Sequence, residues 1–156
     1  MNAPWHRSAN GEEWTSNPLP SAAALVGLVR VLVVYGNGLN QEIGATLRCA
    51  GYDVTVAADG EAAFKAVRNG DFNLVLMDLE MPVMGGIDTA RRIRKLGGRV
   101  GRIPIVAVTA QSAGVEEVAR CQAAGMDELL IRPVSARLML RVVVHWTWCV
   151  GETVAD

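Results

Sequence analysis

A single carboxylate, Asp78, lies where an apolar run meets a loop that contains proline and glycine. Residues 74–77 before it are all hydrophobic, and residues 82–86 after it hold one proline and two glycines. This pattern is typical of a buried parallel strand that ends in a turn. In open α/β folds the carboxyl ends of such strands form the edge where ligands bind. Asp78 is therefore a candidate nucleophile or metal ligand at that edge.

Alternating apolar and amphipathic segments predict the fold that would position this carboxylate. Five short apolar runs have the character of strands, and each precedes a segment whose hydrophobic residues recur with helical spacing. Such strands and helices predict a doubly wound α/β fold, with a five-stranded parallel sheet covered on both faces. The predicted strands are residues 29–34, 52–57, 72–77, 103–108 and 128–131, and the predicted helices are residues 40–50, 61–68, 86–96, 115–124 and 135–148.

The chain is predicted to hold one domain with a flanking segment at each end. Residues 1 to about 21 contain three prolines and no apolar periodicity, so we expect residues 1–27 to be a disordered or loosely docked leader. Residues 28–149 contain every predicted strand and helix and should form the domain. Residues 150–156 are expected to be a C-terminal tail.

Composition restricts the compartment and the partners. Hydrophobic residues make up 51% of the 156 residues, and the formal net charge is -1, so no general attraction to nucleic acid or anionic membrane is expected. Cys49, Cys121 and Cys149 lack CxxC spacing, which predicts neither a disulfide framework nor a zinc site. The apolar stretch 22–34 is interrupted by Arg30 and is too short to span a bilayer. We expect a cytoplasmic protein without nucleic-acid or membrane partners.

Several segments, taken in order, resemble the receiver domain of two-component response regulators, particularly the receivers of hybrid histidine kinases. The resemblance runs from Val31 to about Leu140 and implies a flavodoxin-like (βα)5 fold. The segments that carry it are 74–86 (LVLMDLEMPVMGG), 104–110 (PIVAVTA) and 124–127 (AGMD), with support from 40–42 (NQE) and 57–60 (AADG).

The resemblance implies a chemistry, the transfer of a phosphoryl group from a phosphohistidine to an aspartate with the help of Mg²⁺. It implies that Asp78 is the phospho-acceptor, and that Thr109 and Arg132 supply the hydroxyl and the cation of the phosphoryl pocket. It also implies a cis peptide bond between Arg132 and Pro133. A histidine kinase or a histidine phosphotransfer protein is the partner that follows from such a reaction.

Other positions depart from the family pattern. The two acids that hold the metal in family receivers are here Tyr35 and Gly36, and the switch aromatic is Leu129. Asp78 and Glu80 are the remaining candidate metal ligands, so we expect no firm cofactor and weak Mg²⁺ binding at most. The ring of Tyr35 is expected to fill the vacated metal position. The Glu80 carboxylate either partly replaces the lost acids or is a solvated loop acid.

Arginine replaces the family lysine at Arg132. Arginine remains charged and can bind a phosphoryl group through two N–H groups, but it is larger than lysine. Its side chain either points to solvent or pairs with Asp78, because the loss of two acids leaves the cation with one obvious partner. We predict the standing Arg132–Asp78 pair.

The last predicted helix, residues 135–148, is apolar almost all round, whereas a helix that covers a sheet should have one polar face. Two explanations remain open. The leader of the same chain covers its outer side, or the helix forms a partner surface, for example in a homodimer.

Together these features predict an atypical receiver domain that signals by protein-protein interaction, with Mg²⁺-dependent phosphorylation of Asp78 weakened or absent. We expect no enzymatic activity of its own. One alternative is a working phospho-acceptor that tolerates the missing acids. Another is a flavodoxin-like small-molecule-binding domain, although the glycine-bearing turn 35–38 lacks a recognised nucleotide-binding pattern.

Overall fold

The computed structural model describes residues 5–7, 14–16, 28–35, 41–81, 84–109 and 114–149. Five parallel strands form one sheet in the order β4-β3-β5-β6-β7. The first of them, β3, lies inside the sheet, so the chain adds β4 on one side and then β5 to β7 on the other. This arrangement confirms the predicted flavodoxin-like doubly wound fold. The strands are β3 (Arg30–Val34), β4 (Asp53–Ala57), β5 (Leu74–Asp78), β6 (Ile105–Thr109) and β7 (Glu128–Ile131).

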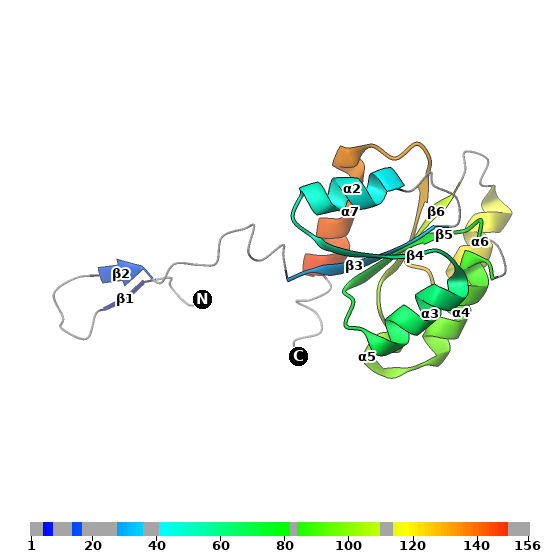
Figure 1. Cartoon of the computed structure of the whole chain (residues 1–156), viewed down its shortest axis with the longest axis horizontal. Helices are drawn as coiled ribbons and strands as arrows, with labels where there is room; N and C mark the ends of the chain where they lie inside the picture. Colours follow the sequence, from blue (N-terminus) through cyan, green and yellow to red (C-terminus); the bar gives the residue numbers. More distant parts are fainter. Residues whose placement is uncertain are drawn as a thin grey trace.

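Helices cover both faces of this sheet (Figure 1). Helices α2 and α7 pack on one face, and α3, α4 and α6 pack on the other, as the two hydrophobic clusters show. The bounds are α2 (Gln41–Cys49), α3 (Gly60–Asn69), α4 (Gly86–Lys95), α5 (Gly98–Gly101), α6 (Val115–Ala123), α7 (Ala136–Val144) and a π-helix, η2 (His145–Cys149).

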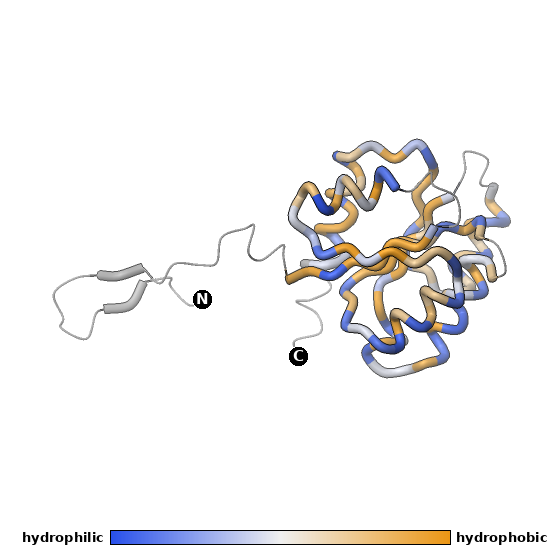
Figure 2. The backbone as a smooth tube through the Cα atoms, viewed as in Figure 1, coloured by the Kyte–Doolittle hydropathy of each residue, from blue (hydrophilic) through white to orange (hydrophobic). Residues whose placement is uncertain are grey.

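The central strands are buried on both faces, which explains why they are apolar throughout. In β5, Val75 and Met77 join the cluster beneath α3 and α4, whereas Leu74 and Leu76 join the cluster beneath α2 and α7. Successive side chains of a strand point to opposite faces, so a sheet between two helical layers needs hydrophobic residues at every position. Figure 2 shows the hydrophobic stretches along the strands, while the helices alternate between hydrophobic and hydrophilic residues.

Strands β5 and β6 each end on a polar residue that the sequence-based prediction placed just after the strand. Asp78 still pairs with Val108 in the parallel register, so it is the last residue of β5. Thr109 pairs with Ile131 and is the last residue of β6. The predicted strands 72–77 and 103–108 are therefore displaced by one or two residues.

Two small features are not predicted from the sequence. Strand β1 (Trp5–Arg7) pairs with β2 (Trp14–Ser16) in an antiparallel hairpin, within the segment predicted to be an irregular leader. A single helical turn, α5, begins at Gly98, the second residue of the glycine pair that follows α4. The rest of the predicted leader and the tail 150–156 lie outside the described residues, so the domain boundaries stay predictions.

The last helix, α7, has one buried side and one exposed side, although its sequence is apolar almost all round. Met139, Val142 and Val143 are buried against the sheet, whereas Leu138 and Val144 are exposed. Arg137 and Arg141 also lie on the exposed side. Among the described helices, none combines the length and the hydrophobicity that crossing a membrane would require.

Candidate functional site

Asp78 lies at the carboxyl edge of the sheet with both carboxylate oxygens in contact with neighbours. Only 3% of its surface is exposed. Its Oδ1 accepts a hydrogen bond of 2.9 Å from the backbone N–H of Glu80. Its Oδ2 lies 3.1 Å from Nη2 of Arg132. The predicted standing ion pair is thus confirmed, and the alternative of an Arg132 side chain in solvent is wrong.

Arg132 follows β7 directly and is anchored beside β6. Its backbone N–H donates to the carbonyl of Thr109 at 2.9 Å, and the peptide bond to Pro133 is cis, as expected. The Arg132 side chain is 19% exposed. Its Nε and Nη2 atoms are buried and donate no hydrogen bond to the described residues, although Nη2 is close to Asp78. The pair is therefore held by charge and proximity, and one edge of the guanidinium keeps unused donors.

Thr109 is buried at the same edge, but its hydroxyl is occupied. Its exposed fraction is 2%, and Oγ1 donates to Oε1 of Glu117 at 3.3 Å. Glu117 lies in the first turn of α6. The sequence contains no motif that marks Glu117, because the contact joins two side chains across the loop between β6 and α6. The sequence offers one indication of this contact, the presence of acidic residues in the first turn of α6.

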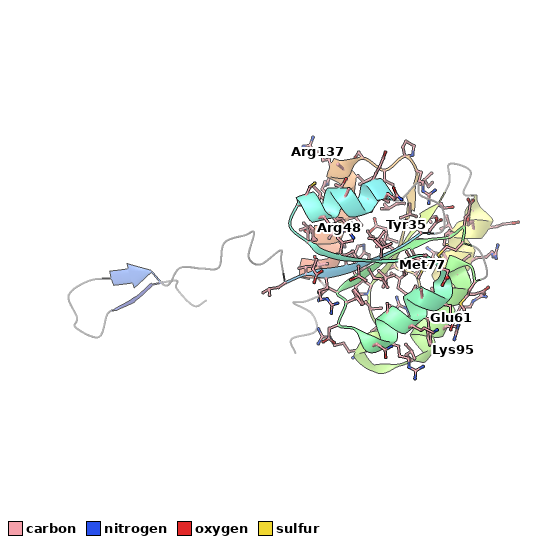
Figure 3. All side chains as sticks on the ribbon, in the orientation of Figure 1. Tyr35, Arg48, Glu61, Met77, Lys95 and Arg137 are labelled. Atoms are coloured by element: carbon pink, nitrogen blue, oxygen red, sulfur yellow. The ribbon has the colours of Figure 1, made fainter. Side chains whose placement is uncertain are left out.

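The positions assigned to metal binding do not form a cluster of acids. Tyr35 is half-buried and packs against the hydrophobic cluster beneath α2 and α7, on the side of the sheet where Figure 3 labels it. Its placement in the vacated metal position stays a prediction. Gly36 lies outside the described residues. Glu80 is exposed, and Leu129 is half-buried against the opposite cluster.

Within the described parts of the chain, no group of three or more His, Cys, Asp or Glu side chains could hold a metal ion. Mg²⁺ prefers several oxygen ligands in an octahedral arrangement. Here one buried carboxylate already faces a guanidinium, and the neighbouring Glu80 carboxylate is exposed. This donor set does not fit a Mg²⁺ site.

Gly86 allows α4 to begin directly against the end of β5. A Cβ atom at this position would lie 2.5 Å from the carbonyl oxygen of Asp78, which is far inside van der Waals contact. The N–H of Gly86 also donates to the carbonyl of Leu79. The glycine therefore sets the close approach of α4 to the loop that follows Asp78.

An acid, a hydroxyl and a cation at the ends of β5, β6 and β7 of a doubly wound sheet define the receiver class of signalling domains. The family model of the response regulator receiver domain matches residues 32–144. The chain belongs to this family, and it is a receiver domain of two-component phosphorelay systems, similar to the receivers of hybrid histidine kinases. The resemblance stated from the sequence is confirmed.

Similar proteins include sensor kinases from bacteria. The chain is 38% identical to the sensor protein GacS of Pseudomonas syringae over 121 residues, which cover 76% of this chain and 13% of GacS. It is 32% identical to the CAI-1 autoinducer sensor kinase/phosphatase CqsS of Vibrio cholerae over 118 residues, which cover 75% of this chain and 17% of CqsS. The chain thus spans less than a fifth of the length of either relative.

Solved receiver structures have the same fold. The receiver domain of the sensor histidine kinase PA1611 of Pseudomonas aeruginosa, with magnesium in its active-site cleft, superposes with a TM-score of 0.70 at 33% identity. That match covers 76% of this chain and 97% of the PA1611 domain. The Saccharomyces cerevisiae complex of the phosphotransfer protein Ypd1 with the Ssk1 receiver gives 0.71 at 28% identity, covering 79% and 90%.

Proposed function

We propose that this receiver domain signals through protein-protein contacts and that Mg²⁺-dependent phosphorylation of Asp78 is weakened or lost. The observation that supports this proposal most strongly is the contact between Asp78 and Arg132 at 3.1 Å. A receiver with its usual acids balances three carboxylates against a lysine and a metal ion. Here one carboxylate faces one guanidinium, so their charges offset each other without a metal.

The contacts of Asp78 also bear on its reactivity. A carboxylate oxygen attacks phosphorus through a lone pair, and both oxygens of Asp78 already have a neighbour. Each oxygen keeps a second lone pair, but attack would have to compete with the contact to Arg132 and the hydrogen bond from Glu80, which withdraw electron density from the carboxylate. The standing pair would therefore lower the nucleophilicity of Asp78 and hold the domain in one conformation.

The proposed partner is a histidine kinase or a histidine phosphotransfer protein. The similar Ssk1 receiver has been solved in complex with the phosphotransfer protein Ypd1, and the relatives GacS and CqsS are sensor proteins. On this proposal the domain is not itself an enzyme. A cytoplasmic location also remains a proposal, and it fits the free thiols of Cys49 and Cys121, since such thiols persist in reducing compartments.

Self-association through the last helix stays a prediction. Leu138 and Val144 expose apolar surface on α7, but three other apolar residues of this helix are buried in the domain's own core. Sedimentation velocity of the full chain over a wide range of concentrations would detect a homodimer.

One observation favours the alternative of a working phospho-acceptor. Among the described residues, the Nε and Nη2 atoms of Arg132 are buried donors without a hydrogen bond, and such donors are costly. Oxygens of a phosphoryl group on Asp78 would satisfy them in a two-point contact. The other alternative, a small-molecule-binding domain, would require binding of a nucleotide or flavin to the purified chain.

A magnesium titration tests the proposal. We expect the amide signals around Asp78 to show no saturation with millimolar Mg²⁺, because the described residues offer no cluster of acidic ligands. The combined substitutions Tyr35→Asp and Gly36→Asp should restore measurable affinity, because they return two carboxylates to the family's metal positions. Saturable binding of Mg²⁺ by the native chain in the micromolar range would contradict the proposal.

A further inference from the structure

The hydroxyl of Thr109 is committed to an acceptor that the family pattern does not anticipate. Oγ1 lies 3.3 Å from Oε1 of Glu117, and Thr109 is only 2% exposed, so bulk water does not replace this partner. Glu117 itself is half-buried in the first turn of α6. A threonine hydroxyl carries one proton. While Thr109 donates to Glu117, it has no proton left for another acceptor.

We propose that Glu117 is a positioning residue that withholds the Thr109 proton from a phosphoryl group on Asp78. The proposal rests on the assignment of Asp78 as the phospho-acceptor position. Asp78 is aligned with Val108 across the sheet, so the next residue along β6, Thr109, borders the place where that group would be attached. Thr109 must leave Glu117 before it can donate to a phosphoryl oxygen.

Charge acts in the same direction as the hydrogen bond. A phosphoryl group adds negative charge to Asp78, and the Glu117 carboxylate lies 3.3 Å from the hydroxyl of Thr109, at the end of the neighbouring strand β6. Like charges at short range in a partly buried site repel each other more strongly than they do in water. Glu117 therefore disfavours the phosphorylated state of Asp78 in two ways, by accepting the hydrogen bond from Thr109 and by its charge. Phosphorylation of Asp78 would also break the hydrogen bond between the end of β6 and the start of α6.

Labelling with acetyl phosphate in the presence of Mg²⁺ measures this effect. An Asp78 oxygen attacks phosphorus, the bond between phosphorus and the acetate oxygen breaks, and acetate leaves with the electron pair. We expect Glu117→Ala to raise the labelling rate by roughly two- to fivefold, less than a hydrogen bond of ideal length to a charged group would give, because 3.3 Å is long for an O–H···O contact. Glu117→Gln should give a smaller increase, because its amide oxygen can still accept the hydrogen bond from Thr109 but carries no charge. Intact mass follows the reaction.

Glu116 provides a matched control. It is an exposed acid in the same first turn of α6, so Glu116→Ala removes the same charge from nearly the same place without the contact to Thr109. We expect a much smaller change in the labelling rate than for Glu117→Ala, because water and salt screen this exposed carboxylate. An equal increase for Glu116→Ala and Glu117→Ala would overturn the proposal, because it would reveal a general effect of charge.

A Thr109→Val background tests whether Glu117 acts through the hydroxyl. Glu117→Ala should lose most of its effect on labelling there, and in the native background it should shift the methyl resonance of Thr109. An unchanged Thr109 resonance would contradict the hydrogen bond. Thermal unfolding of each variant shows whether the fold is retained.

All rates are measured in the native chain and in the Tyr35→Asp/Gly36→Asp background, which separates the two proposals. The difference in labelling rate between the two backgrounds tests the proposed function. Within one background, the labelling rate of Glu117→Ala divided by that of its parent tests the role of Glu117. If that ratio stays near one in both backgrounds, Glu117 does not restrain Thr109. If no variant is labelled, the Thr109 methyl resonance decides, because an unchanged resonance in Glu117→Ala contradicts the contact.

Discussion

The side chains of Arg132 and Asp78 form an ion pair in a site that is largely shielded from solvent, with exposed fractions of 19% and 3%. Removing one member of such a pair leaves a buried charge without compensation, which costs more than the pair contributes when intact. This asymmetry makes the ion pair accessible to stability measurements, whatever its effect on phosphorylation.

Arg132→Ala should therefore lower the free energy of unfolding by about 2–4 kcal/mol, somewhat below the usual cost for fully buried pairs because Arg132 is partly exposed. Urea unfolding measures the change. Arg137→Ala is the control, because Arg137 is an exposed arginine at the start of α7 (Figure 3) and should change stability by less than about 0.5 kcal/mol. In an Asp78→Asn background the cost of Arg132→Ala should shrink. An undiminished cost there would show that Arg132 stabilises the domain by packing alone.

Cys121 gives the domain a dependence on alkaline pH. Burial raises the pKa of its thiol above the ordinary value of 9.0, Glu117 raises it further, and Arg120 opposes the shift. Because the thiol ionises more readily in the unfolded chain, its contribution to stability is complete below the ordinary pKa. That contribution is lost as the pH rises from there through the raised pKa of the folded state.

We expect the free energy of unfolding to fall more steeply above about pH 9 in the native chain than in Cys121→Ala. Equilibrium unfolding at a series of pH values measures the slope. Cys49→Ala serves as the control, because it removes an exposed thiol and should keep the native slope. Equal slopes for the native chain and Cys121→Ala would show that burial does not disfavour the Cys121 thiolate.

At the scale of elements, one arginine of α4 contacts the segments that lead into β6 and β7, at the edge of the sheet opposite to Asp78. Arg94 donates to the carbonyls of Gly125, Gly101 and Ile103 at 2.6–2.9 Å and to Asp127 at 3.0 Å. Burial lowers the pKa of Arg94, while the charge of Asp127 opposes that change. These bonds satisfy carbonyls at the end of α6 and around α5 that have no helical partner.

Arg94→Ala should cost about 2–3 kcal/mol of stability, because several carbonyls and one carboxylate lose a charged donor at once. Arg91→Ala is a matched control on the same helix. Its contact with Asp88 is long, at 3.4 Å, and exposed, so we expect a cost below about 0.5 kcal/mol. Equal costs in thermal or urea unfolding would mean that the Arg94 contacts do not hold these elements together.

Two helical glycines should respond in opposite directions to alanine. Gly86→Ala places a Cβ against the Asp78 carbonyl at 2.5 Å and should destabilise the domain by about 1–3 kcal/mol. Gly44 lies inside α2, and a Cβ atom added there would lie 3.9 Å from Cγ1 of Val54, an ordinary van der Waals distance. Gly44→Ala should therefore stabilise the domain by roughly 0.5–1 kcal/mol. A stabilising Gly86→Ala would show that α4 does not approach β5 as closely as described.

Hydrophobic periodicity was sufficient to predict the five strands and the principal helices, because burial on both faces of the sheet leaves an apolar run for each strand. The single turn α5 was missed because four residues carry too little periodicity. The hairpin of β1 and β2 was missed because three-residue strands provide no detectable alternation.

The same limit applies to the site. The contact between Arg132 and Asp78 was predictable, since the resemblance places both residues at one edge and their charges are opposite. The contact between Thr109 and Glu117 was not, because it depends on how a loop returns α6 to the sheet. Chain patterns indicate which strand ends meet, but they do not specify which neighbouring side chain reaches a hydroxyl.

At the scale of the whole molecule, the sheet brings the ends of β5, β6 and β7 together, and the described residues at that edge form two closed contacts. Arg132 engages Asp78, and Glu117 engages Thr109. On the proposed function, a receiver in this state would present a fixed surface to its partner, and a phosphoryl group on Asp78 would change that surface by displacing these contacts.

The most direct test is intact-mass measurement of the native chain after incubation with acetyl phosphate and Mg²⁺, alongside the Tyr35→Asp/Gly36→Asp variant and an Asp78→Asn control. We predict that the native chain remains largely unmodified while the double variant gains the mass of a phosphoryl group, and that Asp78→Asn gains none. Rapid and complete labelling of the native chain at Asp78 would contradict the account, because it would show that the missing acids and the Arg132 contact do not impede phosphoryl transfer.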